Sequence, residues 1–87
     1  MALVIIPALL RDLCGGSNKI EVDGATIGEV LRAVDAVHPG FFARVVEDGI
    51  VRPELAFAID GEVIGLALHD LIASNAEIAI VPAIGGG

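Results

Sequence analysis

The chain has 87 residues, enough for one domain, and 55% of them are apolar. Twelve acidic residues against five basic ones give a net charge of −7, which would repel a phosphate backbone, so we expect no nucleic-acid partner. No apolar run approaches the roughly 20 residues that cross a bilayer, so we expect no membrane partner. The single cysteine, Cys14, excludes an internal disulfide and a cysteine-based metal cage, and we expect it to be small and buried.

The first ten residues, MALVIIPALL, are largely apolar and could be taken for a secretion signal. A signal peptide begins with a basic region, which is missing here, and Pro7 interrupts the apolar run. We therefore expect this segment to belong to the mature domain, and the protein to be soluble and cytoplasmic.

Two strands are predicted before the first helix. Residues 3–7 (LVIIP) form a continuous apolar run, whereas residues 19–23 (KIEVD) alternate polar and apolar side chains, which is typical of a half-buried strand. The connection between them contains the turn signal Gly15-Gly16. The sequence therefore predicts a hairpin with a long loop.

A helix is predicted over residues 26–38. Thr26 and Glu29 have the spacing of a capping box, in which the two side chains satisfy free N–H groups at the start of a helix. Apolar residues then recur at helical spacing. They are Ile27, Val30, Leu31, Val34 and Val37. Pro39 and Gly40 end the helix.

The segment after this helix is predicted to contain a second hairpin. Residues 41–54 are expected to form a short helical turn and then a loop. Residues 55–59 alternate large and small side chains, and Asp60-Gly61 is a strong signal for a two-residue hairpin turn. The segment that follows the hairpin, residues 66–76, is expected to be a turn or a short 3₁₀ segment.

The last strand is predicted over residues 77–82 (EIAIVP) and, like the first, is almost continuously apolar, which favours a central position in the sheet. A right-handed crossover through the helix would place these terminal strands side by side and parallel. We predict an α+β fold of the β-grasp (ubiquitin-like) type, with a mixed sheet and one main helix packed on one face. The domain is expected to span residues 1–82, followed by a flexible C-terminal tail, residues 83–87.

Small residues recur on the later strands at Ala56, Ala58 and Ala79, and we expect them to share the sheet face opposite the helix. A smooth face of this kind would suit a flat partner surface, so the pattern predicts a docking site. The simpler interpretation is a sheet face that small side chains make tolerable in water.

The chain ends VPAIGGG, and this tail is the chemically informative segment. Pro82 cannot donate a ladder hydrogen bond, so we expect strand pairing to end there. The residues from Pro82 onward reach at most about 20 Å, and glycine can pass a channel too narrow for a side chain. The only reactive group that the tail delivers is the α-carboxylate of Gly87, which ATP could activate as an acyl-adenylate.

No catalytic set accompanies this carboxylate. His38 falls at the predicted end of the helix, and His69 stands beside Asp70 without a nucleophile, so we expect both histidines to be structural or exposed. The catalytic groups would therefore come from a partner, and the chain would be a substrate rather than an enzyme.

The chain resembles the ThiS/MoaD family of sulfur carriers over almost its whole length. The resemblance rests on the strand LVIIP, the helix TIGEVLRAV, the segment AIDGEVI and above all the glycine tail. In that family, a C-terminal Gly-Gly pair follows a strand and a proline-containing segment. One departure is SNAE, residues 74–77, where the family often has an Asp-Gly-Asp-like turn; Asn75 tolerates positive φ and could make the same turn.

The resemblance implies that a ubiquitin-activating-like adenylating enzyme uses ATP to adenylate the carboxylate of Gly87. A sulfur donor protein then converts it to a thiocarboxylate, which donates sulfide to an acceptor synthase of the cysteine, molybdopterin or thiamine type. Gly86 corresponds to the other glycine of the pair, Gly85 is an additional glycine, and Ile84 completes the segment that partners would recognise. The resemblance implies no bound cofactor.

Three alternatives remain open at this stage. The chain could be a protein modifier whose C-terminal carboxylate forms isopeptide bonds with lysines of other proteins. It could be a non-covalent β-grasp interaction module whose tail has no role, or, least in keeping with its residues, a small enzyme. Among the sulfur carriers, its two ends look most like the cysteine-synthesis type.

Overall fold

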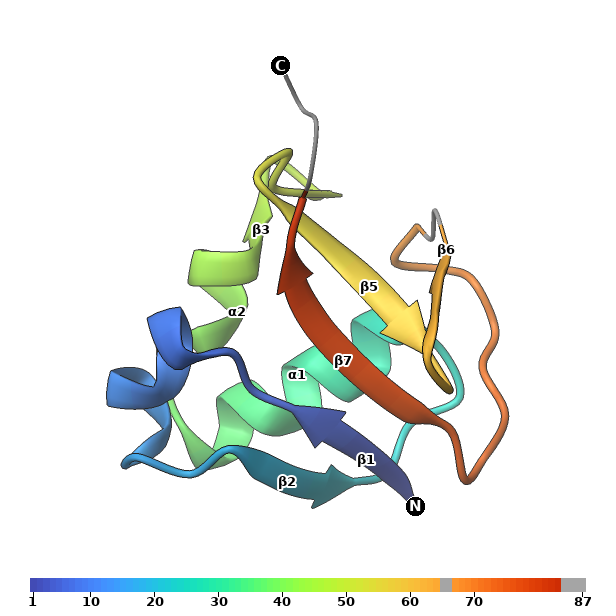
Figure 1. Cartoon of the computed structure of the whole chain (residues 1–87), viewed down its shortest axis with the longest axis horizontal. Coiled ribbons are helices and arrows are strands. Elements are labelled where there is room, and N and C mark those ends of the chain that lie inside the picture. Colours follow the sequence, from blue (N-terminus) through green and yellow to red (C-terminus); the bar gives the residue numbers. More distant parts are fainter. Residues whose placement is uncertain (65–66, 84–87) are drawn as a thin grey trace.

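A mixed sheet with the strand order β2-β1-β7-β5-β6 is the centre of the computed structural model, which describes residues 1–64 and 67–83 (Figure 1). Its strands are β1 (Ala2–Ile5), β2 (Lys19–Val22), β5 (Leu55–Ile59), β6 (Glu62–Ile64) and β7 (Glu77–Pro82). The first and last strands, β1 and β7, are parallel neighbours, and the main helix lies behind the sheet in Figure 1. The predicted β-grasp fold is therefore confirmed.

The predicted N-terminal hairpin is present. β1 and β2 pair antiparallel, with Ala2 opposite Val22 and Ile5 opposite Lys19. The 3₁₀ helix η1 (Ala8–Cys14) fills the connection and ends at Gly15, whose φ of 62° lies in the left-handed region that glycine adopts without strain. β1 ends before the predicted residue 7, because the chain turns there into η1.

The main helix, α1 (Ile27–Val37), begins as predicted. The Thr26 hydroxyl accepts a hydrogen bond from the Glu29 N–H at 3.2 Å, and a Glu29 carboxylate oxygen accepts one from the Ala25 N–H at 3.0 Å. Four of the five apolar residues that recur at helical spacing are buried, but Val37 is 61% exposed. Val37 is the last residue of α1, and it lies beyond the part of the helix that packs on the core.

Residues 41–51 differ from the prediction. A short helix, α2 (Phe41–Val45), is followed by a small two-stranded sheet, β3 (Val46–Glu47) and β4 (Ile50–Val51), where we expected only a loop. The turn between these strands is Asp48-Gly49, with φ of 54° and 78°. The correctly predicted turn Asp60-Gly61 has nearly the same values, 51° and 88°. The dipeptide Asp-Gly therefore occurs twice in the chain, with similar backbone φ values in both turns.

The segment before β7 covers the start of α1. The Gly28 N–H donates to the Leu68 carbonyl at 2.7 Å, and the Ile27 N–H donates to the Asp70 carbonyl at 3.1 Å. Turns were predicted here and are present, without a 3₁₀ helix in residues 67–76. In the turn at residues 73–76, Asn75 does not adopt the positive φ that we expected, because a hydrogen bond from the Ala76 N–H to the Ala73 carbonyl closes the turn without a left-handed residue.

The core lies between the sheet and the helices. Its largest fully buried side chains include Phe41 from α2, Phe57 from β5, Leu31 from α1 and Ile78 from β7. Cys14 belongs to this cluster with no exposed surface, as we expected for a small buried residue. Within the described ranges, no helix has the length and apolar character needed to cross a membrane.

Candidate functional site

The base of the tail is fixed by a hydrogen bond just beyond the end of β7. Pro82 is in register with Leu55, and the Ala83 N–H then donates to the Glu54 carbonyl at 2.8 Å. Hydrogen-bonded and non-bonded pairs alternate along an antiparallel ladder, so the bonded pair Glu54/Ala83 makes Leu55/Pro82 a non-bonded pair. The missing N–H of Pro82 therefore breaks no bond to β5. β7 and its ladder with β5 end at Pro82, as we expected, and the Ala83 hydrogen bond follows directly after the ladder.

This anchor limits how far the carboxylate can be carried. Ile84, Gly85, Gly86 and Gly87 lie outside the described residues. Four residues span at most about 14 Å, which is less than the length that we expected from Pro82. A protein that binds the Gly87 carboxylate must therefore bring its own surface close to Ala83.

The three alanines singled out in the sequence lie on one face of the sheet. Ala58 is directly opposite Ala79, and Ala56 is opposite Val81 on the same face. The residues between them, such as Phe57 with 2% exposure, point to the helix side. The predicted position of the alanines is therefore correct, while their role in docking stays a prediction.

The strand register extends this face beyond the alanines. Ile5 of β1 is opposite Ala79, and Val63 of β6, which is 69% exposed, is opposite Ala58. We call this surface the open face. The charged residues Lys19, Glu21 and Glu77 share it beside Leu3 and Ile5, and its apolar residues are Leu3, Ile5, Ala56, Ala58, Val63, Ala79 and Val81. The strands pass in front of α1 in Figure 1, so the open face is turned toward the reader. An apolar surface of this kind, rimmed by polar residues, is typical of a protein interaction site.

Sequence reasoning missed Leu3, Ile5, Val63 and Val81. The almost continuously apolar sequences of β1 and β7 contain no alternation that would assign their faces, although side chains two residues apart do share a face. Assembling them into one surface also requires the parallel pairing of β1 with β7, which joins the two ends of the chain.

The other sequence candidates do not form a catalytic site. Burial raises the pKa of the Cys14 thiol, which makes the thiol a weaker nucleophile at neutral pH. His38 is the C-cap of α1, and its N–H donates to the Val34 carbonyl. His69 is exposed, and a carboxylate oxygen of its neighbour Asp70 accepts a hydrogen bond from the Ala67 N–H at 2.7 Å. Asp70 is therefore engaged by its own loop.

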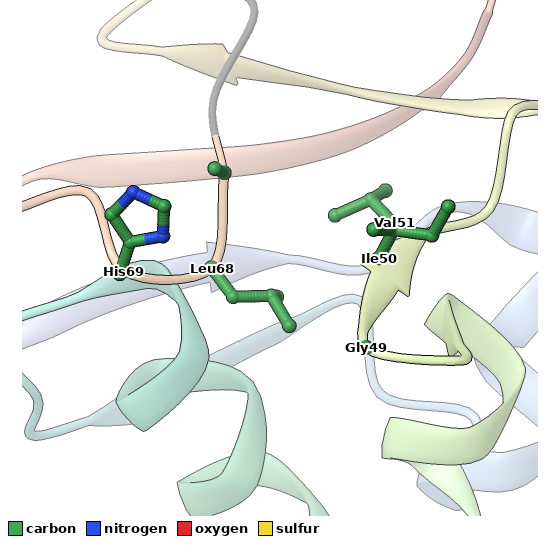
Figure 2. Close-up of a pocket in the computed structure, with 6 residues that line it drawn as sticks. Gly49, Ile50, Val51, Leu68 and His69 are labelled. Carbon is green, nitrogen blue, oxygen red and sulfur yellow. The ribbon is translucent and has the colours of Figure 1, made fainter.

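His69 also borders a shallow cavity of about 340 Å³. Figure 2 shows Leu68 and His69 on one side of it, and Ile50 and Val51 of β4 on the other. The described residues that line it are Gly49, Ile50, Val51, Ala67, Leu68 and His69. Among these described lining residues, the His69 imidazole is the one side chain with a polar group, and no hydroxyl, thiol or carboxylate accompanies it.

Together, the fold and the C-terminal glycines define a ubiquitin-like β-grasp protein with a glycine tail. The family model described as "ThiS family" matches residues 4–87, almost the whole chain. The chain therefore belongs to the ThiS family.

Curated relatives of two kinds are similar to the chain. Small archaeal modifier protein 1 of Haloferax volcanii is 34% identical over 81 residues, which cover 90% of this chain and 91% of the relative. The sulfur carrier protein CysO of Mycobacterium tuberculosis is 27% identical over 89 residues, covering 97% of this chain and 96% of the relative. One group of relatives is thus named for protein modification and the other for sulfur transfer.

Solved structures agree with this assignment. The crystal structure of the BexX/CysO complex of Amycolatopsis orientalis contains a chain that matches with a TM-score of 0.88 and 28% identity, covering 100% of both chains. Crystalline CysO of Mycobacterium tuberculosis matches with a TM-score of 0.87 and 25% identity, covering 97% of this chain and 100% of that one. A similar chain has therefore been crystallised in complex with another protein.

Proposed function

We propose that the chain is a sulfur carrier whose C-terminal carboxylate is converted to a thiocarboxylate. A ubiquitin-activating-like adenylating enzyme joins the Gly87 carboxylate to the AMP part of ATP and releases pyrophosphate. Sulfide delivered by a donor protein then attacks the carbonyl carbon of the adenylate, the C–S bond forms and AMP leaves, and the resulting thiocarboxylate gives sulfide to an acceptor synthase. The observation that supports the proposal is the anchor at Ala83, which holds the residue just before Ile84 and the glycines at the end of β7, next to Val81 of the open face in the strand.

Each tail residue has a role in this proposal. Gly87 supplies the carboxylate that is activated. Gly86 and Gly85 have no side chains, so they fit a narrow channel that leads to ATP. Ile84 provides the last side chain before the glycines and would be recognised at the mouth of that channel.

The open face is the proposed docking surface for the adenylating enzyme. Ala56, Ala58 and Ala79 form its centre, where small side chains let a flat surface approach the sheet closely. Val81 lies next to Pro82 in the sequence and opposite Ala56, so the surface continues to the base of the tail. An enzyme that holds the tail would cover this surface at the same time.

Protein modification is the second candidate, and the relatives named as modifiers favour it. Small archaeal modifier protein 3 of Haloferax volcanii is 33% identical over 67 residues, which cover 75% of this chain and 73% of the relative. In this alternative, a lysine amine of another protein attacks the same acyl-adenylate and forms an isopeptide bond. The activation step is shared, so only the fate of the activated carboxylate separates the two candidates.

An acceptor of the cysteine-synthesis type is our first choice, because the tail and the start of the chain look most like carriers of that type. Molybdopterin and thiamine synthesis are the alternatives. Because the first step consumes ATP, we place the carrier in the cytoplasm.

Intact-mass spectrometry tests the proposal. The full chain is incubated with ATP, the adenylating enzyme and a sulfur donor protein. We expect a mass gain equal to the replacement of one oxygen by sulfur, confined to the C-terminal peptide. Lysine-linked conjugates without this product would favour the modifier. If neither the sulfur-containing product nor lysine-linked conjugates form, the chain is a non-covalent interaction module.

A further inference from the structure

A small hollow of about 140 Å³ lies beside the base of the tail. It is lined by Leu9, Leu10, Arg44, Arg52, Glu54 and Leu55. The carbonyl of Glu54 is the group that accepts the hydrogen bond of Ala83, so the hollow and the tail base share a residue. Two of the five basic residues of this acidic chain meet here.

The first of these two cations, Arg52, is held in place by the chain itself. Its Nη2 donates to the Ala43 carbonyl at 3.0 Å, and its Nη1 lies 3.6 Å from a Glu47 carboxylate oxygen. Its buried Nε has no hydrogen-bond partner among the described residues. The guanidinium is therefore held in position, but the described residues leave its Nε–H without a hydrogen-bond acceptor.

Arg44, the second cation, is exposed and forms no ion pair with a described residue. The carboxylates nearby are Glu47, which pairs with Arg52, and Glu54, which lines the hollow and likewise has no ion pair in the described ranges. Leu9, at 64% exposure, adds an apolar wall. The hollow thus offers a guanidinium that is free to bind a carboxylate, next to an apolar contact.

The reach of the tail determines what must cover this hollow. A protein that binds the Gly87 carboxylate has to approach within about 14 Å of Ala83, the length of four extended residues. The hollow adjoins Ala83 through Glu54, so it lies at the rim of the surface that such a protein covers. Charged pairs at the rim of an interface mainly affect the association rate and its salt dependence.

We infer that the hollow is a second contact site for the adenylating enzyme, in which Arg44, supported by Arg52, binds a carboxylate side chain of that enzyme. The inference rests on the proposed function and adds to it an electrostatic contact that selects the partner. In a chain of net charge −7, the Arg44 guanidinium, which has no ion pair among the described residues, would orient the tail exit toward an acidic group beside the active site.

Steady-state ATP–pyrophosphate exchange with the purified adenylating enzyme tests this inference on the full chain. Reversing the charge with Arg44→Glu should raise the KM for the carrier roughly tenfold with little change in kcat, because only association is weakened. Arg44→Lys should stay close to wild type. The difference between wild type and Arg44→Glu should shrink as salt is added, since exposed charges are screened.

The matched control is Arg32→Glu, which makes the same change in net charge on α1, the helix behind the sheet. Thermal unfolding confirms that each variant folds. An unchanged KM for Arg44→Glu, or an equal rise for Arg32→Glu, would overturn the inference while the proposed function stands. If Arg44→Glu weakens exchange only when the acceptor synthase is present, the hollow contacts that synthase instead, and the inference is also overturned. If the wild-type chain itself supports no exchange, both proposals fail.

Discussion

Asp60 and Glu77 exchange two hydrogen bonds although 17 residues separate them in the sequence. The Asp60 N–H donates to the Glu77 carbonyl at 2.8 Å, and the Glu77 N–H donates to an Asp60 carboxylate oxygen at 3.0 Å. Asp60 also occupies the left-handed region, with φ of 51°. One residue therefore makes the turn between β5 and β6 and fixes the start of β7.

Replacing Asp60 tests this double role. Asp60→Ala removes the carboxylate acceptor and puts alanine in a left-handed conformation, so we expect a loss of about 1–3 kcal/mol in the free energy of unfolding. Asp60→Asn keeps an acceptor oxygen and tolerates this conformation, so it should lose less. Urea unfolding measures both, and equal losses would mean that the side-chain bond to Glu77 contributes nothing.

The second prediction concerns the buried face of α1. Leu31 has no exposed surface, so Leu31→Ala should cost roughly 2–5 kcal/mol of stability. Val37 stands on the same helix but is 61% exposed, and Val37→Ala should cost less than about 0.5 kcal/mol. Chemical denaturation of the two variants provides the comparison, and a similar cost at both positions would contradict the packing described above.

The third prediction separates the tail from the domain. Deleting Gly86 and Gly87 should leave the melting temperature almost unchanged, because glycines have no side chains to pack. The same deletion should abolish ATP–pyrophosphate exchange, since it withdraws the carboxylate by about 7 Å. Gly86→Val should also lose exchange, because a branched side chain would clash in a narrow channel. A truncated chain that is activated as fast as wild type would exclude both the carrier and the modifier.

The fourth prediction concerns the open face. Ala58→Arg places a long charged side chain at its centre and should raise the KM for the carrier at least tenfold, a loss of about 1.4 kcal/mol or more. The control, Ala36→Arg, adds the same side chain at an exposed position of α1 on the other side of the sheet. Both variants should unfold near the wild-type temperature. If the two behave alike in the exchange assay, the open face is not the docking surface.

Local sequence signals were sufficient for much of the fold. Thr26 and Glu29 predicted the start of α1, because a capping box depends only on residues three apart. Asp60-Gly61 predicted a hairpin that is present. The same dipeptide at Asp48-Gly49 was missed, because its strands are only two residues long each and show no alternation to mark them.

Non-local pairing accounts for what the sequence could not supply. The open face joins Ile5, near the start of the chain, to Ala79, near its end, and only the sheet register brings them together. The hollow at Arg44 and Arg52 likewise needs η1, α2 and the start of β5 in place. The tail anchor at Ala83 depends on the register between β7 and β5, which brings Ala83 opposite Glu54, and the tail sequence contains no signal for this register.

The register at Pro82 also protects the chain from unwanted assembly. β7 pairs with β1 only as far as Ala79, so its last residues border no strand on that side within the described ranges. The nitrogen of Pro82 faces this free edge, since Ala83 directs its N–H toward β5. A strand edge with free N–H groups invites pairing with another chain, and proline removes a donor at the place where the tail leaves. At Pro82, the free side of β7 therefore offers no N–H group to a strand of a second copy of the chain.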